Sequence, residues 1–116
     1  MRDLLLQCAG ILAIMVAVIH GILGETKVFP RATIEPPRLR TLIRLVWQAS
    51  TVAWIGGGVL LIAAPWMESD AARHWIIATF AVVFGFAALA NALATRTVHL
   101  GWIGMSAAVV LAFAGY

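Results

Sequence analysis

The sequence predicts an all-α fold, an integral membrane protein whose four transmembrane helices form an antiparallel four-helix bundle. Of the 116 residues, 63% are hydrophobic and 11% are charged, whereas about 25% are charged in ordinary soluble domains. The chain contains four apolar runs, each close to the roughly 20 residues that a helix needs to cross a bilayer. Small residues recur every three or four positions in these runs, which lets helices approach one another closely in lipid. Residues 1–116 are expected to form a single domain.

The first helix is predicted over residues 4–23. Ala9, Ala13, Ala17 and Gly21 follow one another at steps of four, so they share one face of the helix. No small-residue cleavage site follows the run, and we therefore expect a retained helix instead of a signal peptide.

A longer loop is expected over residues 25–36, before a second helix over residues 37–66. The residue before a proline disfavours helical geometry, so the pair Pro36 and Pro37 places the helix start at Pro37. Small residues in this helix are Ala49, Ala53 and Gly57. The glycine triplet at residues 56–58 lies in an apolar helix, and we interpret it as a packing or flexing element.

The third and fourth helices are predicted over residues 72–95 and 98–115. Ser69 or Asp70 is placed to cap the third helix. The small residues are Ala81 and Gly85 in the third helix and Gly104, Ala108 and Ala112 in the fourth. Short connections before both helices make these neighbours antiparallel.

The distribution of basic residues predicts the orientation of the chain. Five of the eight lie in or beside the first connection, and Arg96 follows the third helix, whereas only Arg2 and Arg73 lie on the other side. Because positively charged loops stay in the cytoplasm, six against two places both termini outside it, in the plasma membrane or, in a bacterium, the inner membrane. Arg73 and its neighbour His74 are expected to serve interfacial packing in the outer turn.

Polar side chains form a band at one depth of the predicted bundle. Each of the four helices contributes one: His20, Gln48, Asn91 and His99. Four residues from a helix end correspond to about 6 Å, so all four lie near the cytoplasmic end of the apolar layer. Glu25 follows the first helix and is expected to pair with Arg44 or Arg40. These residues predict a ligand-binding site, because polar groups in a bilayer are costly and tend to face a bundle interior. The candidate site residues are His20, Glu25, Arg44, Gln48, Asn91 and His99.

Three functional hypotheses follow from this band. The first is a non-enzymatic membrane component, either an accessory subunit or a small transporter, without a cofactor. The second is a redox protein that binds b-type haem or quinone through His20 and His99, because haem takes axial histidines from facing helices. The third is a metal-assisted enzyme that uses His20, Glu25 and His99, because catalytic metals need at least three protein ligands. A bridging role between helices is the structural alternative to any ligand site.

Other classes are excluded by residue content. The single cysteine, Cys8, excludes an intrachain disulfide, and no phosphate loop, nucleophile elbow or nucleotide fingerprint is present. The basic residues that give the chain its net charge of +3 flank apolar segments. We therefore expect them to contact anionic lipid headgroups and not nucleic acid. The predicted partners are the lipid bilayer and either further copies of the chain or a membrane complex.

Overall fold

A computed structural model describes the whole chain, residues 1–116, as four helices without strands. Helix α1 covers Arg2–Leu23 and continues into a π-helical turn, η1, at Gly24–Val28. Helix α2 covers Pro37–Ala63 and ends in a 3₁₀ turn, η2, at Ala64–Trp66. Helix α3 covers Asp70–Ala94 and α4 covers Gly101–Ala114. The all-helical class predicted from the sequence is confirmed.

The fourth helix is shorter than the sequence predicts. It begins at Gly101 instead of residue 98, and its 14 residues rise about 21 Å, less than the roughly 30 Å of a hydrocarbon core. The preceding turn contains Arg96 and Thr97 in left-handed backbone conformations, with φ of 51° and 64°. Three helical segments are long and apolar enough to cross a membrane, Arg2–Val28, Pro37–Trp66 and Asp70–Ala94. The prediction of a fourth helix of that length is therefore wrong.

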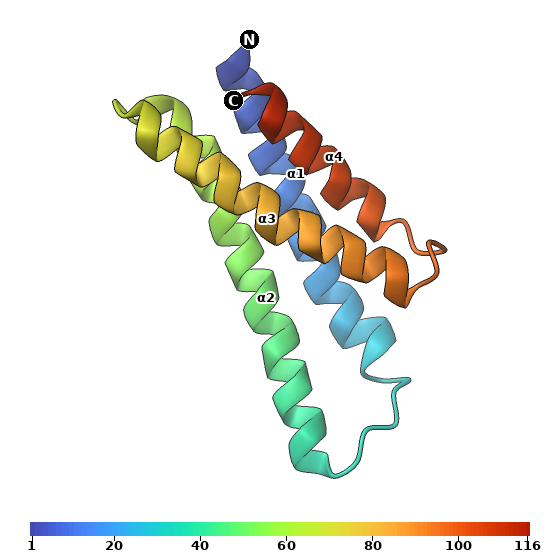
Figure 1. The fold of residues 1–116 in the computed structure, drawn as a ribbon. Coiled ribbons are helices and arrows are strands. Elements are labelled where there is room, and N and C mark those ends of the chain that lie inside the picture. The colour runs from blue at the N-terminus through green and yellow to red at the C-terminus, as the bar shows by residue number, and fades with distance from the viewer.

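Helices α1 and α2 form the longest packed pair of the molecule (Figure 1). Near one end they meet at two glycines: a Cβ atom on Gly10 would lie 2.5 Å from the Gly58 carbonyl oxygen, and one on Gly58 would lie 2.7 Å from the Gly10 oxygen. Towards the other end, Gly21 lies against Gln48 and Thr51. The partner numbers fall along α2 as they rise along α1, so the two helices run in opposite directions.

Helix α4 also packs against α1, with Gly115 beside Leu6 and Gly104 beside Val16. Both chain termini consequently lie at the same end of the molecule (Figure 1). Helix α3 crosses the α1–α2 pair obliquely, and its last turns lie beside the start of α4 and away from α2 (Figure 1). This leaves the C-terminal half of α1 without a helix on the side that faces the α3–α4 turn.

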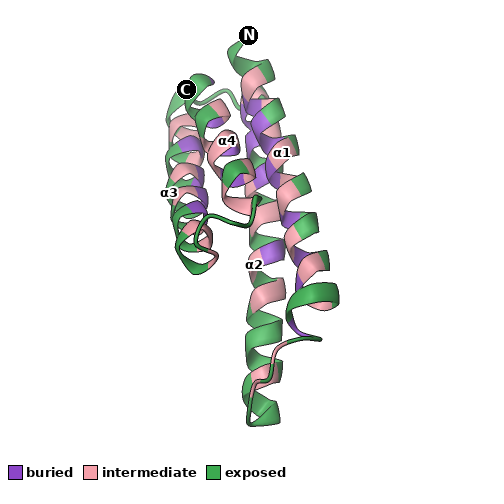
Figure 2. Ribbon diagram, turned by 90° about the vertical axis from the view of Figure 1, so that its right-hand side faces the viewer, coloured by how far each residue is buried: buried purple, intermediate pink, exposed green.

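The helices contribute side chains of different size to the core. Ala9, Ala13 and Ala17 of α1 are fully buried, as the spacing of its small residues predicts. In α3 the buried residues are larger, and Phe80 stacks on Phe84 with ring centroids 4.3 Å apart. Figure 2 shows that all four helices contribute buried residues on the faces that they turn towards their neighbours, whereas the first turns of α2 are exposed.

The small-residue contact predicted for α2 is wrong. Ala49 and Ala53 are exposed, and the buried glycine is Gly58 instead of Gly57. A Cβ atom on Gly57 would lie 3.5 Å from the Phe80 ring, an ordinary contact distance, and one on Gly56 would meet nothing within 4 Å. Of the triplet, only Gly58 thus lies where the packing leaves no room for a side chain.

Candidate functional site

A cavity of about 610 Å³ lies between the C-terminal half of α1 and the α3–α4 turn. Its volume falls within the roughly 300–1,000 Å³ of small-molecule sites. Most of the lining is apolar, and Trp47 of α2 contributes part of the wall. The polar residues of the lining are His20, Asn91, Thr95 and His99. No aspartate, glutamate, lysine or arginine lines the cavity.

His20 is held in position by aromatic rings and one hydroxyl group. Its ring is stacked on Trp47 with centroids 4.2 Å apart and planes 5° apart, and it also contacts Trp54 at 4.4 Å. The Trp47 indole N–H donates to the His20 carbonyl oxygen at 2.9 Å. Trp47 therefore fixes both the backbone and the imidazole of His20.

The hydrogen bonds of Ser50 determine which nitrogen of neutral His20 carries the proton. Ser50 Oγ donates to the Trp47 carbonyl oxygen at 2.6 Å and lies 3.1 Å from His20 Nε2. A hydroxyl group has only one proton, so His20 Nε2 must donate to Ser50. The proton of the neutral ring is then on Nε2, which leaves Nδ1 as an acceptor. No side chain or backbone donor of the protein contacts this Nδ1.

His99 and Asn91 face the same cavity from the α3–α4 side. His99 Nδ1 accepts a hydrogen bond from the Gly101 backbone N–H at 3.1 Å, so neutral His99 carries its proton on Nε2. Asn91 lies in the last turns of α3, and its buried Oδ1 has no hydrogen-bond partner. An unpaired buried oxygen costs about 1–3 kcal/mol. The cavity thus contains polar groups whose hydrogen-bonding capacity the protein leaves unused.

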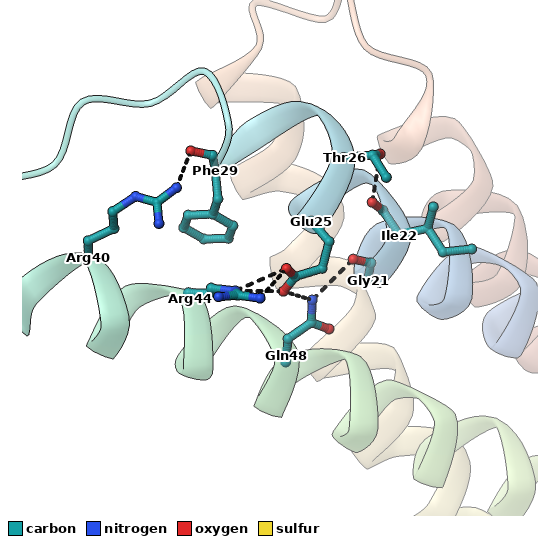
Figure 3. Close-up of polar contacts among 8 residues, drawn as sticks. All are labelled: Gly21, Ile22, Glu25, Thr26, Phe29, Arg40, Arg44 and Gln48. Atoms are coloured by element: carbon teal, nitrogen blue, oxygen red, sulfur yellow. Dashed lines mark hydrogen bonds and ion pairs between the residues drawn. The ribbon is translucent and has the colours of Figure 1, made fainter. Parts of the chain in front are cut away.

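Glu25, Arg44 and Gln48 form a second cluster between η1 and α2 (Figure 3). Arg44 forms an ion pair with Glu25 at 2.6 Å. Gln48 Nε2 donates to Glu25 at 2.9 Å and to the Gly21 carbonyl oxygen at 3.1 Å. Arg40 donates to the Phe29 carbonyl oxygen at 2.6 Å (Figure 3). These bonds attach the end of α1 and the start of the loop to α2.

Trp47 connects the cluster and the cavity. It precedes Gln48 in the chain, lines the cavity and packs against Phe29 in an edge-on contact at 5.7 Å. The indole lies over Gly24, where a Cβ atom would collide with Nε1. A glycine is therefore required at this helix end for the tryptophan to reach His20.

The six site residues predicted from the sequence thus fall into two groups. His20, Asn91 and His99 line one cavity, whereas Glu25, Arg44 and Gln48 do not line it. The sequence analysis missed Trp47, although a signal was present. Trp47 lies three residues after Arg44 and next to Gln48, so helical spacing places it on the same side of the helix as Arg44, a predicted site residue.

Haem b held by His20 and His99 does not fit these hydrogen bonds. A histidine that ligates iron usually donates its other ring N–H to a protein acceptor. His99 Nδ1 accepts instead of donating, so His99 does not suit this role, whereas His20 donates from Nε2 to Ser50 and keeps only its Nδ1 free. Ligation by Nε2 of either ring would require these bonds to be lost.

The three-ligand metal site considered from the sequence is not formed. No group of three or more histidine, cysteine, aspartate or glutamate side chains is close enough together to hold a metal ion. His20, Glu25 and His99 therefore do not make the ligand set that this hypothesis requires.

At the opposite end of the molecule, Arg73 is more than a packing residue. Its side chain is 14% exposed, forms an ion pair with Asp3 at 2.8 Å and donates to the Gly115 carbonyl oxygen at 3.3 Å. His74 stacks on Tyr116 with centroids 4.2 Å apart. These contacts join α1, α3 and the C-terminal end of α4.

No protein-family model, curated protein or solved structure matches the chain.

Proposed function

We propose that the chain is an integral membrane protein that binds an apolar small molecule in the cavity between α1 and the α3–α4 turn. It acts as a non-enzymatic membrane component, either a small transporter or an accessory subunit. The observation that carries the proposal is the cavity itself: about 610 Å³, mostly apolar, with His20, Asn91 and His99 in its lining. An apolar pocket with a few convergent polar groups is typical of binding sites for small molecules.

The surface of the helices supports insertion in a membrane. Large apolar side chains on α2 and α3 are exposed, among them Val52 at 70%, Val82 at 72% and Phe86 at 73%. Water would disfavour such surfaces, whereas lipid tails solvate them. The 27 residues of α2 rise about 40 Å, which exceeds the roughly 30 Å hydrocarbon core. The first turns of α2, which carry Arg38 and Arg40, then extend to the headgroups.

The orientation follows from the same charges. The loop between α1 and α2 lies at the end of the molecule opposite both termini (Figure 1). This loop and the first turns of α2 together carry five of the eight lysine and arginine residues, so this end belongs in the cytoplasm and the termini belong outside it. The cavity, which His20 and the α3–α4 turn border, then lies in the cytoplasmic half of the membrane.

Cysteine labelling tests this orientation. In a Cys8→Ala background, Thr33→Cys and Glu68→Cys place one thiol in each of two exposed connections. A membrane-impermeant maleimide applied to intact cells is expected to label residue 68, and to label residue 33 only after permeabilisation. The opposite pattern would invert the orientation and move the cavity to the outer half of the membrane.

Binding is tested with a pair of matched variants. Ile19 lines the cavity and is 54% exposed, whereas Ile22 is 56% exposed and does not line it. We expect 4-decylanisole to change the tryptophan fluorescence of the wild type in phosphatidylcholine nanodiscs saturably. Ile19→Trp fills the cavity and should weaken binding about tenfold, equivalent to about 1.4 kcal/mol of steric cost. Ile22→Trp adds the same chromophore to the same helix and should bind like the wild type. Equal binding by both variants would contradict the proposal.

A further inference from the structure

We infer that the cavity selects uncharged apolar molecules that carry a hydroxyl group, with His20 Nδ1 as the acceptor of the hydroxyl proton. The inference rests on the proposed function, because it names the class of molecule that the same cavity binds. The cavity has unused hydrogen-bonding groups in its lining and no charged side chains.

One of the unused groups is an acceptor. Ser50 gives its only proton to the Trp47 carbonyl oxygen, so neutral His20 must donate from Nε2 and present a lone pair at Nδ1. Stacking on Trp47 at 4.2 Å and contact with Trp54 at 4.4 Å restrict rotation of the ring. A bound molecule can therefore pair with Nδ1 only by supplying a donor.

Other unused groups are donors. Because His99 Nδ1 accepts from Gly101, its Nε2 carries the proton and makes no hydrogen bond within the protein. The Asn91 side chain offers its amide N–H groups as further donors, and its buried Oδ1 is an unpaired acceptor. A bound molecule thus meets an acceptor on α1, and both donors and an acceptor on the α3–α4 side.

A hydroxyl group matches this combination because it donates one hydrogen bond and accepts others. A ketone or an ether only accepts, and would leave His20 Nδ1 unpaired. A phosphate or carboxylate is charged, and no lysine or arginine lines the cavity to compensate for that charge. Hydroxylated rings and diacylglycerols share the required chemistry, since both join one hydroxyl group to an apolar body.

The experiment compares probes that differ only at the hydroxyl group. 4-Decylphenol, its methyl ether 4-decylanisole and dioleoylglycerol are titrated into the protein in phosphatidylcholine nanodiscs, followed by tryptophan fluorescence. One additional hydrogen bond should make the phenol bind about fivefold more tightly than the ether. Tight binding of dioleoylglycerol as well would identify the hydroxyl group alone as the determinant, whereas its failure to bind would restrict the class to hydroxylated rings.

His20→Phe retains an aromatic ring between the two tryptophans and removes the acceptor. A circular dichroism spectrum like that of the wild type verifies its fold, and the variant should lose the preference for the phenol over the ether. His74→Phe alters the other stacked histidine, which lies outside the cavity, and should keep the preference. If His20→Phe does not fold, Ser50→Ala provides the second test: it frees Nε2 from its partner and should reduce the preference.

The outcomes separate this inference from the proposed function. Equal binding of phenol and ether by the wild type, or a preference that persists in a folded His20→Phe variant, would overturn the inference while leaving the cavity as a binding site. Absence of saturable binding for all three probes would overturn the proposed function as well.

Discussion

Replacing Gly58 with alanine tests the contact between the backbones of α1 and α2. A Cβ atom at this position would lie 2.7 Å from the carbonyl oxygen of Gly10 and 2.7 Å from Cγ1 of Ile14. The Ile14 side chain can rotate away, but the carbonyl oxygen belongs to the backbone of α1. The two helices must therefore separate to admit one methyl group.

The expected change in the free energy of unfolding combines two opposing effects. Alanine is more favourable than glycine inside a helix by about 0.5–1 kcal/mol, whereas overpacking a close contact costs about 1–3 kcal/mol. The obstructing atom is backbone, so we expect the upper part of that cost and a net loss of about 1–2 kcal/mol. Gly56→Ala is the matched control in the same helix, because its Cβ atom meets nothing within 4 Å. It should stabilise the protein by the helix contribution alone.

Unfolding by dodecyl sulfate in dodecylmaltoside micelles, followed by circular dichroism, measures both free energies. The account predicts that Gly58→Ala unfolds at lower dodecyl sulfate than the wild type, and that Gly56→Ala unfolds at equal or higher dodecyl sulfate. Equal stability of the two variants would refute the reasoning, because it would show that α1 and α2 are not in backbone contact at this point.

Four further substitutions test three polar contacts with the same unfolding assay. Trp47→Phe retains an aromatic ring beside His20 but removes the indole N–H, and should reduce the free energy of unfolding by about 1 kcal/mol; an unchanged value would show that the bond to the His20 carbonyl contributes nothing. Glu25→Gln removes an ion pair whose side chains are 51% and 36% exposed, so its small effect should shrink further at high salt. An effect that is independent of salt would contradict an exposed pair. Asp3→Asn should destabilise more than Arg73→Met, because it leaves the guanidinium, which is 14% exposed, without its counter-charge; the reverse order would contradict this account.

Helical spacing predicted α1 well because one physical effect dominates there. Ala9, Ala13 and Ala17 are fully buried, and the alternative faces of the same helix carry larger side chains such as Ile11 and Met15. Close approach between helices in lipid requires small side chains. The face that carries the three alanines can therefore be recognised as the contact face from the sequence alone. The start of α2 was equally well marked, since Pro37 both ends the loop and suits the first turn of a helix.

The contact faces of α2 and α3 could not be found in this way. Each helix offers more small residues than it uses, and Ala49 and Ala53 of α2 are exposed. In α3 the contact is made by Phe80 and Phe84, which pack against Gly57 and Trp54. The oblique path of α3 depends on these large rings, and no repeat of small residues encodes it.

The sequence indicates how deep each candidate site residue lies along its helix, but not the direction in which it points. Depth along a helix can be counted from the sequence, so His20, Asn91 and His99 were predicted at one level, and they line one cavity. Direction around the bundle depends on how helices cross, and this separates Gln48 from the cavity although it lies next to Trp47. The start of α4 was misplaced because of the turn before it, in which Thr97 takes a left-handed conformation that β-branched residues rarely adopt.

Photo-crosslinking tests the central claim most directly. A benzophenone derivative of 4-decylphenol is irradiated with the protein in phosphatidylcholine nanodiscs, and the modified residues are identified by mass spectrometry. The account predicts modification within residues 16–28 and 95–105, which border the cavity, and loss of that modification when excess 4-decylphenol competes. Modification spread over lipid-facing residues such as Val52 and Val82, unaffected by the competitor, would show that the probe dissolves around the helices and that the cavity is not a binding site.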